Sequence, residues 1–153
     1  MNYSLVYLFV IVPYFVYNVN VKKPKTTSQL KKILDKTFSE YVRRTNADQN
    51  GDCICVTCGK KDHWKNMHNG HYLSRQYLST RYDETNCHIQ CPSCNVFKGG
   101  NYTAYALFML DKYGEEKLQW LEQQKHVITK DYPYVEKIEE YKNKLDALNK
   151  NII

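Results

Sequence analysis

The sequence predicts an α+β fold in which a small, zinc-stapled core lies between an N-terminal helix and C-terminal helices. Two Cys-x-x-Cys pairs, Cys55/Cys58 and Cys91/Cys94, have the spacing that closes one tetrahedral zinc site. The segment 51–101 around them holds only short strand-like runs, whereas apolar residues recur at helical spacing on both sides of it. Since this segment has too little apolar material for an independent core, we expect a bound metal to hold it together.

The first segment, residues 1–25, begins with an apolar and aromatic run and ends in a basic linker. The run lacks the basic start and the small-residue cleavage site of a signal peptide. As a membrane span it is short and is broken by Pro13. We interpret it as a β-rich piece packed on the domain or as translated sequence upstream of the true start, with a membrane anchor as the less favoured alternative.

Residues 26–50 predict one amphipathic helix followed by a turn. Threonine and serine at 26–28 are capping candidates, and the helix is expected to end near Arg44. The stretch 46–51 resembles the first half of a calcium-binding loop, but Thr57 stands where a bidentate acid is required, so we expect only a polar turn. The apolar residues at helical spacing are Leu30, Ile33, Leu34, Phe38, Tyr41 and Val42.

Residues 51–101 are expected to form the zinc-bound core, with strands near 53–56, 71–73 and 87–90. Four thiolates fill a structural zinc site and leave no open position for chemistry. Disulfides or a redox pair are the alternative use of these cysteines. Cys53 and Cys87 lack a partner at this spacing and are expected to be small buried hydrophobic residues. Thiolates kept reduced for a metal indicate a reducing, cytoplasmic compartment.

Residues 102–153 predict further helices. Apolar and aromatic residues recur at helical spacing up to a break at Tyr113-Gly114, again around Trp120, and again from Val135 to Leu148. The simplest interpretation of these stripes is a helical core.

The chain carries a formal net charge of +6. This charge favours a polyanionic partner such as nucleic acid, and a basic surface that only keeps the protein soluble is the alternative.

Among the polar side chains between the two cysteine pairs or directly after them, five are candidates for a common site: His68, His71, Asn86, His88 and Asn95. A zinc ion that joins the ends of this segment would bring them into one small site. Such a set suits hydrolysis with one divalent cation, because an imidazole deprotonates water while the cation compensates charge on a phosphate.

The order and spacing of these residues resemble a known family. The matching motifs are Cys55/Cys58, Gly70-His71-Tyr72, the run from Asn86 through Asn95, and Lys98-Gly99-Gly100-Asn101. Together they resemble NinG (Rap), a family of phage recombination endonucleases in the HNH, or ββα-metal, nuclease superfamily, which includes endonuclease VII. The resemblance extends from residue 53 to about 150 and does not include the first twenty residues.

The resemblance implies a strand-strand-helix core around a divalent cation and cleavage of branched DNA such as Holliday junctions or D-loops. It implies that His71 is the general base, that Asn95 binds the catalytic cation, and that Asn86 holds the loop that orients the base. His68 stands where the endonuclease VII pattern has an aspartate. Imidazole compensates the charge of Mg²⁺ less well than carboxylate does, which favours Mn²⁺. His88 is a candidate further ligand or phosphate-orienting group.

The expected reaction leaves 5′-phosphate and 3′-hydroxyl ends and uses structural Zn²⁺ together with catalytic Mg²⁺ or Mn²⁺. Arg75 and Lys98 are candidate contacts to DNA phosphates. Symmetric cutting of a four-way junction needs two active sites, which a homodimer would supply, and a phage-encoded chain would act in the cytosol of its bacterial host. The alternatives are a zinc-stabilised nucleic-acid-binding module without catalysis and a membrane-tethered zinc protein whose nuclease site has decayed.

Overall fold

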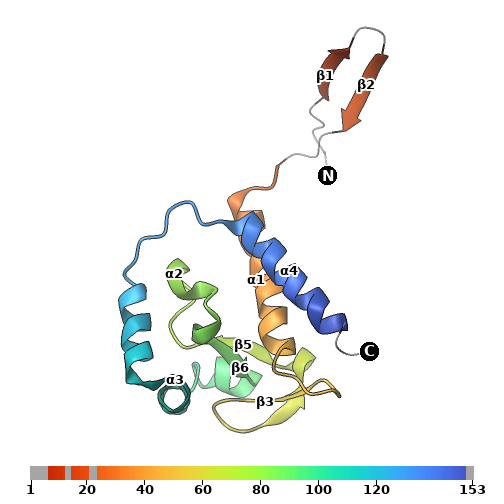
Figure 1. Ribbon diagram of the computed structural model, residues 1–153. Helices are drawn as coiled ribbons and strands as arrows, with labels where there is room; N and C mark the ends of the chain where they lie inside the picture. Colours follow the sequence, from red (N-terminus) through yellow and green to blue (C-terminus); the bar gives the residue numbers. More distant parts are fainter. Residues whose placement is uncertain (1–6, 13–14, 21–23, 151–153) are drawn as a thin grey trace.

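The computed structural model describes residues 7–12, 15–20 and 24–150 (Figure 1). The strands form three two-stranded antiparallel sheets, β1–β2, β3–β4 and β5–β6. The predicted α+β class is confirmed. The elements in chain order are β1 (Tyr7–Val12), β2 (Phe15–Asn20), α1 (Thr27–Arg44), β3 (Asp52–Ile54), β4 (Lys61–His63), η1 (Trp64–Asn66), β5 (His68–His71), α2 (Leu78–Arg81), η2 (Glu84–Asn86), β6 (Cys87–Gln90), η3 (Ser93–Phe97), α3 (Tyr102–Gln124) and α4 (Tyr134–Lys150).

The first segment forms a hairpin of β1 and β2, in which Tyr7 lies opposite Asn20 and Val12 opposite Phe15. These strands agree with the β-rich part of the interpretation, and the packing of the segment on the domain stays a prediction. The rest of it, residues 1–6, 13–14 and 21–23, lies outside the described residues. None of the helices in the described ranges is long and apolar enough to cross a membrane.

Helix α1 begins and ends where the sequence predicts. The Thr26 side chain accepts a hydrogen bond from the Gln29 N–H, and the Gln29 side chain accepts one from the Thr26 N–H, which makes a capping box. Leu34, Phe38 and Val42 are buried along one stripe of the helix. This stripe packs against α4, which lies alongside α1 in Figure 1, and α1 also contacts β5 and β6. The helix therefore lies between α4 and the β5–β6 hairpin.

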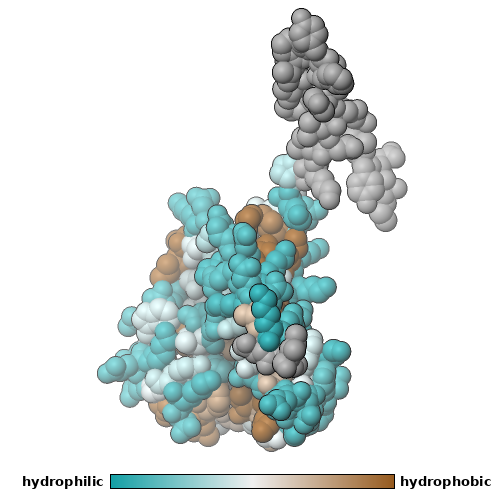
Figure 2. All heavy atoms as spheres, turned by 45° about the vertical axis from the view of Figure 1, so that its right-hand side comes forward, coloured by the Kyte–Doolittle hydropathy of each residue, from teal (hydrophilic) through white to brown (hydrophobic). Residues whose placement is uncertain are grey.

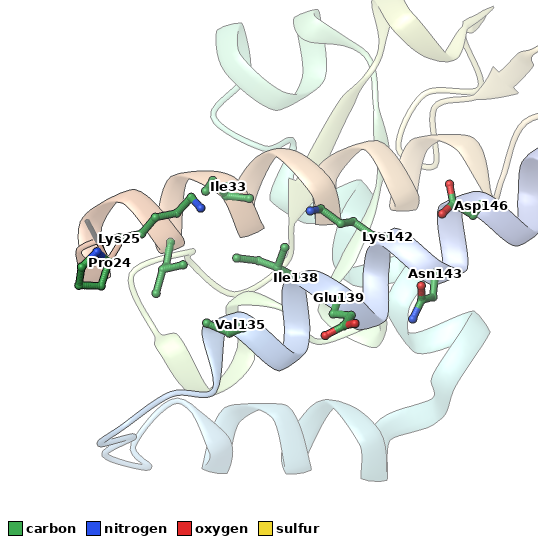
Figure 3. A pocket seen from close by; sticks show the side chains of 10 residues that line it. Pro24, Lys25, Ile33, Val135, Ile138, Glu139, Lys142, Asn143 and Asp146 are labelled. Carbon is green, nitrogen blue, oxygen red and sulfur yellow. The ribbon is translucent and has the colours of Figure 1, made fainter. Parts of the chain in front are cut away.

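A groove of about 600 Å³ runs between α1 and α4 (Figure 3). Its lining combines apolar Ile33 and Ile138 with charged Lys142 and Asp146. Hydrophilic side chains dominate the face shown in Figure 2, with smaller hydrophobic areas between them.

Strand β5 begins and ends earlier than the predicted run at 71–73. It covers His68–His71, because its partner β6 begins only at Cys87. Beyond the strand, the Tyr72 N–H donates to the Asn86 carbonyl, and the Leu73 N–H donates to the Asn86 side chain. The Asn86 side chain thus accepts the hydrogen bond of Leu73 that a strand partner would otherwise accept. Strand β6 itself matches the predicted range of 87–90.

The β3–β4 hairpin contains a strand that the sequence does not predict. β3 is shorter than the predicted run at 53–56, and its partner β4 is polar, so no apolar alternation reveals it. In this pair His63 lies opposite Asp52. The polar turn before β3 is confirmed, since the Asp48 carboxylate accepts N–H bonds from Asn50 and Asp52.

The C-terminal helices break where predicted. Gly114 in α3 has a φ of 75° and a ψ of 170°, a conformation that glycine adopts without strain. Tyr105, Met109 and Leu121 of α3 are buried around Leu73. This contact docks α3 on the loop that follows β5.

Candidate metal centre and histidine site

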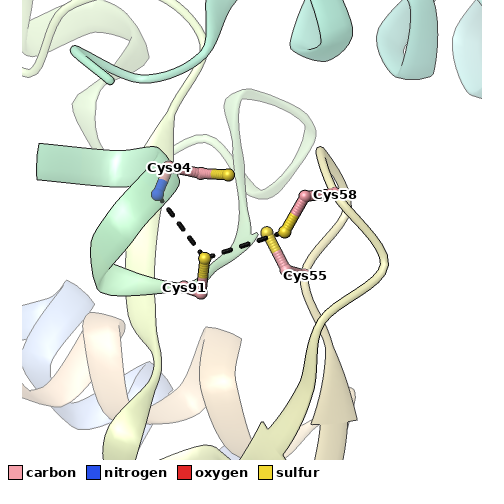
Figure 4. A group of neighbouring side chains, drawn as sticks. All are labelled: Cys55, Cys58, Cys91 and Cys94. Atoms are coloured by element: carbon pink, nitrogen blue, oxygen red, sulfur yellow. Dashed lines mark hydrogen bonds between the residues drawn. The ribbon is translucent and has the colours of Figure 1, made fainter. Parts of the chain in front are cut away.

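Four cysteine sulfurs converge beside the core hairpins (Figure 4). The Sγ atoms of Cys55, Cys58, Cys91 and Cys94 all lie within 4.8 Å of one another, and those of Cys58 and Cys91 are 3.8 Å apart. A tetrahedral zinc ion with Zn–S bonds of about 2.3 Å needs sulfurs about 3.8 Å apart. The predicted ligands are therefore brought together, and they could hold one zinc ion.

The pKa values of two of these thiols are shifted in opposite directions, because the four groups are too close to ionise independently. Burial acts to raise the pKa of Cys55, but hydrogen bonds from Thr57 and from backbone N–H groups lower it to about 6. The pKa of Cys58 is raised to about 12, despite a hydrogen bond from the Lys60 backbone, because burial and three neighbouring thiols oppose its ionisation. Four thiols this close ionise together only when a cation compensates their charge.

The two other cysteines lie outside this cluster. Cys53 and Cys87 are buried, as predicted, and all six cysteines are free rather than paired in disulfides.

The candidate polar residues lie on both faces of the β5–β6 hairpin. His68 pairs with Gln90, Gly70 with His88, and His71 with Cys87. Because successive side chains of a strand point to opposite faces, His68 shares a face with His88, whereas His71 lies on the other face. The structure therefore does not bring His71 together with His68.

His71 has one ring nitrogen held in place. Its Nε2 lies 3.0 Å from the Arg81 carbonyl oxygen, and because a carbonyl only accepts, Nε2 carries the proton and Nδ1 a lone pair. Burial, aided by the charges of Arg75 and Arg81, lowers the pKa of His71 below its ordinary 6.5, although the bond to the Arg81 carbonyl opposes this shift. A neutral imidazole with an unprotonated Nδ1 is what a general base requires at neutral pH.

An ion pair between buried Arg81 and half-buried Asp35 positions the carbonyl that holds His71. The Arg81 guanidinium makes hydrogen bonds of 2.8 and 2.7 Å to the Asp35 carboxylate, and the Tyr82 hydroxyl donates a third at 2.7 Å. These bonds keep the pKa of Asp35 below its ordinary value although burial acts to raise it. The sequence does not reveal this pair, because Asp35 and Arg81 are 46 residues apart and belong to no shared motif.

Asn86 fixes both ends of the loop between β5 and Arg81. Its side chain is fully buried; Oδ1 accepts a hydrogen bond of 2.7 Å from the Leu73 N–H, and Nδ2 donates to the carbonyls of Leu73 and Thr80 at 3.1 and 3.0 Å. The structure thus places Asn86 where it holds the loop that carries the Arg81 carbonyl.

His68 and Asn95 form a pair on the other face of β5. Asn95 lies in η3, directly after Cys94, and its Nδ2 is 3.1 Å from the Nδ1 of His68. The amide donates in this arrangement, so His68 Nδ1 offers a lone pair, and a half-turn of the amide would present a second acceptor, Oδ1. The two predicted cation ligands are therefore neighbours.

His88 lies between the hydroxyl groups of two tyrosines. Its Nδ1 is 3.1 Å from the Tyr105 hydroxyl and its Nε2 is 2.9 Å from the Tyr113 hydroxyl. The Tyr105 hydroxyl donates to the Gly70 carbonyl, so it accepts from Nδ1–H, and Nε2 accepts from Tyr113. Both ring nitrogens are therefore engaged, and this side chain fastens α3 to the β5–β6 hairpin. Binding of a cation or a phosphate by His88 stays a prediction, and it would require one of these hydrogen bonds to break.

Acidification is expected to destabilise the protein through His88. Burial, with a contribution from Lys112, lowers the pKa of His88 to about 3, from 6.5 for an exposed histidine. The unfolded chain then binds a proton below pH 6.5 that the folded chain does not bind, so stability falls as the pH drops from 6.5 toward 3. Between pH 7 and pH 5.5 we expect this residue to contribute a loss of about 1 kcal/mol.

The measurement is urea unfolding at both pH values, with zinc content monitored. The His88→Gln variant, which cannot titrate, is expected to be less stable at pH 7 but to lose less stability on acidification. An equal loss in both proteins would show that His88 is not the group responsible.

Only one of the two predicted phosphate contacts lines the cavity that contains His71. Arg75, whose side chain is 65% exposed, lines a cavity of about 400 Å³ together with His71. Lys98 is exposed and directly follows η3. Arg75 therefore belongs to the His71 side of the hairpin, and Lys98 follows the element that carries Asn95.

Comparison with known proteins gives one family. The family model described as Bacteriophage Lambda NinG protein matches residues 17–151. Protein ninG of Escherichia phage 933W is 27% identical over 108 residues, which are 64% of this chain and 52% of that protein. Protein ninG of Salmonella phage P22 is 29% identical over 82 residues, or 52% of this chain and 39% of that protein. Protein ninG of Escherichia phage lambda is 28% identical over 90 residues, or 57% of this chain and 43% of that protein. No solved structure matches the chain.

The chain spans about half the length of the curated relatives it matches. The family match includes the cysteine cluster, both core hairpins and the helices α1, α3 and α4. Since the match covers most of its length, the chain belongs to the bacteriophage lambda NinG protein family.

Proposed function

We propose that the protein is a metal-dependent DNA endonuclease of the HNH type that cuts branched recombination intermediates. The observation that carries the proposal is the state of His71, a neutral imidazole whose Nε2 is held by the Arg81 carbonyl and which lines a cavity with cationic side chains. A fixed base beside positive charge suits removal of a proton from water next to a phosphate.

In this proposal each residue around the cavity has a separate role. His71 Nδ1 takes the proton of the attacking water, and Arg75 stabilises charge on the phosphate. The Asp35–Arg81 ion pair and the Asn86 side chain are positioning groups, because they hold the carbonyl that orients His71.

His68 and Asn95 would hold the catalytic cation, which when bound compensates charge on the phosphate and on the departing 3′ oxygen. The pair offers a cation two neutral ligands, an imidazole and an amide, and no carboxylate, and this set suits Mn²⁺ better than Mg²⁺.

The choice of branched DNA is supported by the resemblance to phage recombination endonucleases and by membership of the NinG family. The net charge of +6 agrees with a polyanionic substrate. Affinity is expected to come mainly from phosphate contacts and to fall with salt. A homodimer would supply the two sites that symmetric cutting of a junction needs.

A second candidate function is a zinc-stabilised nucleic-acid-binding module without catalysis. The position of His71 on the opposite face of β5 from His68 and Asn95 favours this alternative, because a hydrolytic centre needs base and cation at one phosphate.

The two functions are distinguished by incubating the zinc-loaded protein with labelled four-way junctions, D-loops and linear duplexes, with and without Mg²⁺ or Mn²⁺. The endonuclease is expected to nick the branched DNAs only when the cation is present and to leave 5′-phosphate ends. Binding to DNA without nicking under every condition would identify the non-catalytic module.

Replacing His68 with aspartate is expected to shift the metal preference from Mn²⁺ toward Mg²⁺. A carboxylate supplies the hard, charged oxygen that Mg²⁺ prefers, so the ratio of cleavage rates in Mg²⁺ and Mn²⁺ should rise on the order of tenfold. His126→Asp, which introduces the same charge at an exposed position outside the site, is the matched control. An unchanged ratio in the His68 variant would remove His68 from the cation site.

A further inference from the structure

The cavity that contains His71 is lined on one side by two lysines of α1, Lys32 and Lys36, which belong to none of the motifs described above. It measures about 400 Å³ and lies between α1 and the β5 loop. Helix α1 contributes Lys32, Lys36 and Arg43, and the other side contributes His71 and Arg75.

Positive charge in this cavity is largely uncompensated. Its one lining carboxylate, Asp35, is already bound by Arg81 and Tyr82. Lys32 and Lys36 are exposed, and no ion pair or hydrogen bond joins either side chain to another residue of the described ranges.

Arg43 differs from the two lysines because it is used inside the fold. It donates to the Ser39 and Trp64 carbonyls, and its guanidinium lies 5.3 Å from the centre of the Trp64 ring. Arg75 makes a long ion pair of 3.5 Å with Asp35, although its side chain is 65% exposed. Of the cationic side chains that line the cavity, Lys32 and Lys36 are therefore the two without a partner among the described residues.

The two lysines stand one helical turn apart on the same face of α1. A rise of 1.5 Å per residue separates them by about 6 Å along the axis, a step that suits successive phosphates of a nucleic-acid strand. Like charges four residues apart destabilise a helix slightly, so the pair does not serve the stability of α1. A polyanion beside it removes this repulsion.

We propose that Lys32 and Lys36 bind consecutive backbone phosphates of the DNA strand that reaches His71. This inference rests on the proposed function and places the strand along α1. Lysines at the mouth of the cavity act as point charges on phosphates, so the contact is independent of base sequence.

The test compares the wild-type protein with a Lys32→Ala/Lys36→Ala variant. Affinity for a fluorescein-labelled four-way junction is measured by anisotropy across a salt series, in zinc-loaded protein without added Mg²⁺ or Mn²⁺, so that no cleavage is needed. Each lost phosphate contact should lower the slope of log affinity against log salt by about 0.9, so the double variant should lose about 2 units of slope and bind about tenfold more weakly at low salt.

Lys142→Ala is the matched control, because Lys142 is an exposed lysine in the groove between α1 and α4 (Figure 3). It is expected to keep the wild-type slope. Zinc content and melting temperature show that each variant is folded.

The outcomes separate this inference from the proposed function. A double variant with the wild-type slope and affinity would show that Lys32 and Lys36 do not bind phosphates, and it would leave the endonuclease proposal intact. If the double variant has a reduced salt slope but the wild-type protein never cuts DNA, the phosphate contacts of Lys32 and Lys36 are supported and only the endonuclease proposal is contradicted. A wild-type protein that does not bind DNA would overturn both.

Discussion

Replacing His71 with alanine is expected to abolish cleavage of branched DNA while leaving binding largely intact. His71 is the histidine that lines the cavity, and its Nε2 is fixed by the Arg81 carbonyl. Its pKa is lowered, so Nδ1 has a lone pair that can take a proton. Loss of a general base lowers a rate by about 10²- to 10⁴-fold, whereas most of the affinity comes from phosphate contacts that this variant keeps. The measurement is single-turnover cleavage of a labelled four-way junction at saturating protein, together with anisotropy for binding.

His126→Ala controls for the loss of an imidazole, since His126 is exposed and lies outside the cavity. It should cut at the wild-type rate. Cleavage by the His71 variant at an unchanged rate would eliminate the mechanism proposed for this face of β5, because no other base has been assigned to it.

Replacing Cys91 with serine is expected to release zinc and unfold the core between residues 51 and 101. Cys91 is buried beside the three other sulfurs, and the surrounding apolar cluster is small. Zinc binding at such a site contributes on the order of 10 kcal/mol, which is comparable with the whole stability of a small domain. The expected result is loss of stoichiometric zinc by elemental analysis, with loss of the cooperative thermal transition.

Cys53→Ala is the matched control, because this thiol is buried in the same cluster of side chains but does not belong to the four converging sulfurs. It should retain one zinc ion per chain and lose only about 1 kcal/mol, the scale of a small cavity. Full stability of the Cys91 variant without zinc would show that the core does not depend on metal.

Features that depend on neighbouring residues were predictable from the sequence. Helix α1 follows from the spacing of apolar residues behind the three capping candidates at 26–28, of which the structure selects Thr26. The break at Gly114 follows from glycine within a helical pattern. The cysteine cluster was also predictable, because Cys-x-x-Cys pairs are local motifs whose ligand chemistry leaves few alternatives.

Features that depend on strand register and distant partners were not predictable in this way. The shift of β5 to His68–His71 is decided by where β6 begins, and it places His68 and His71 on opposite faces. The occupation of both His88 nitrogens by Tyr105 and Tyr113 depends on how α3 docks.

The sequence by itself determined the long helices α1, α3 and α4, the four-cysteine ligand set, the choice of candidate histidines and asparagines, and the resemblance to one family. Tertiary structure alone decided which of these side chains meet: His68 with Asn95, His88 with two tyrosines, and His71 with the Arg81 carbonyl. The physical reason is that side-chain chemistry and helical periodicity depend only on residues that are close together in the sequence. A hydrogen bond across dozens of residues depends on packing, which places Lys32 and Lys36 of α1 in the same cavity as His71.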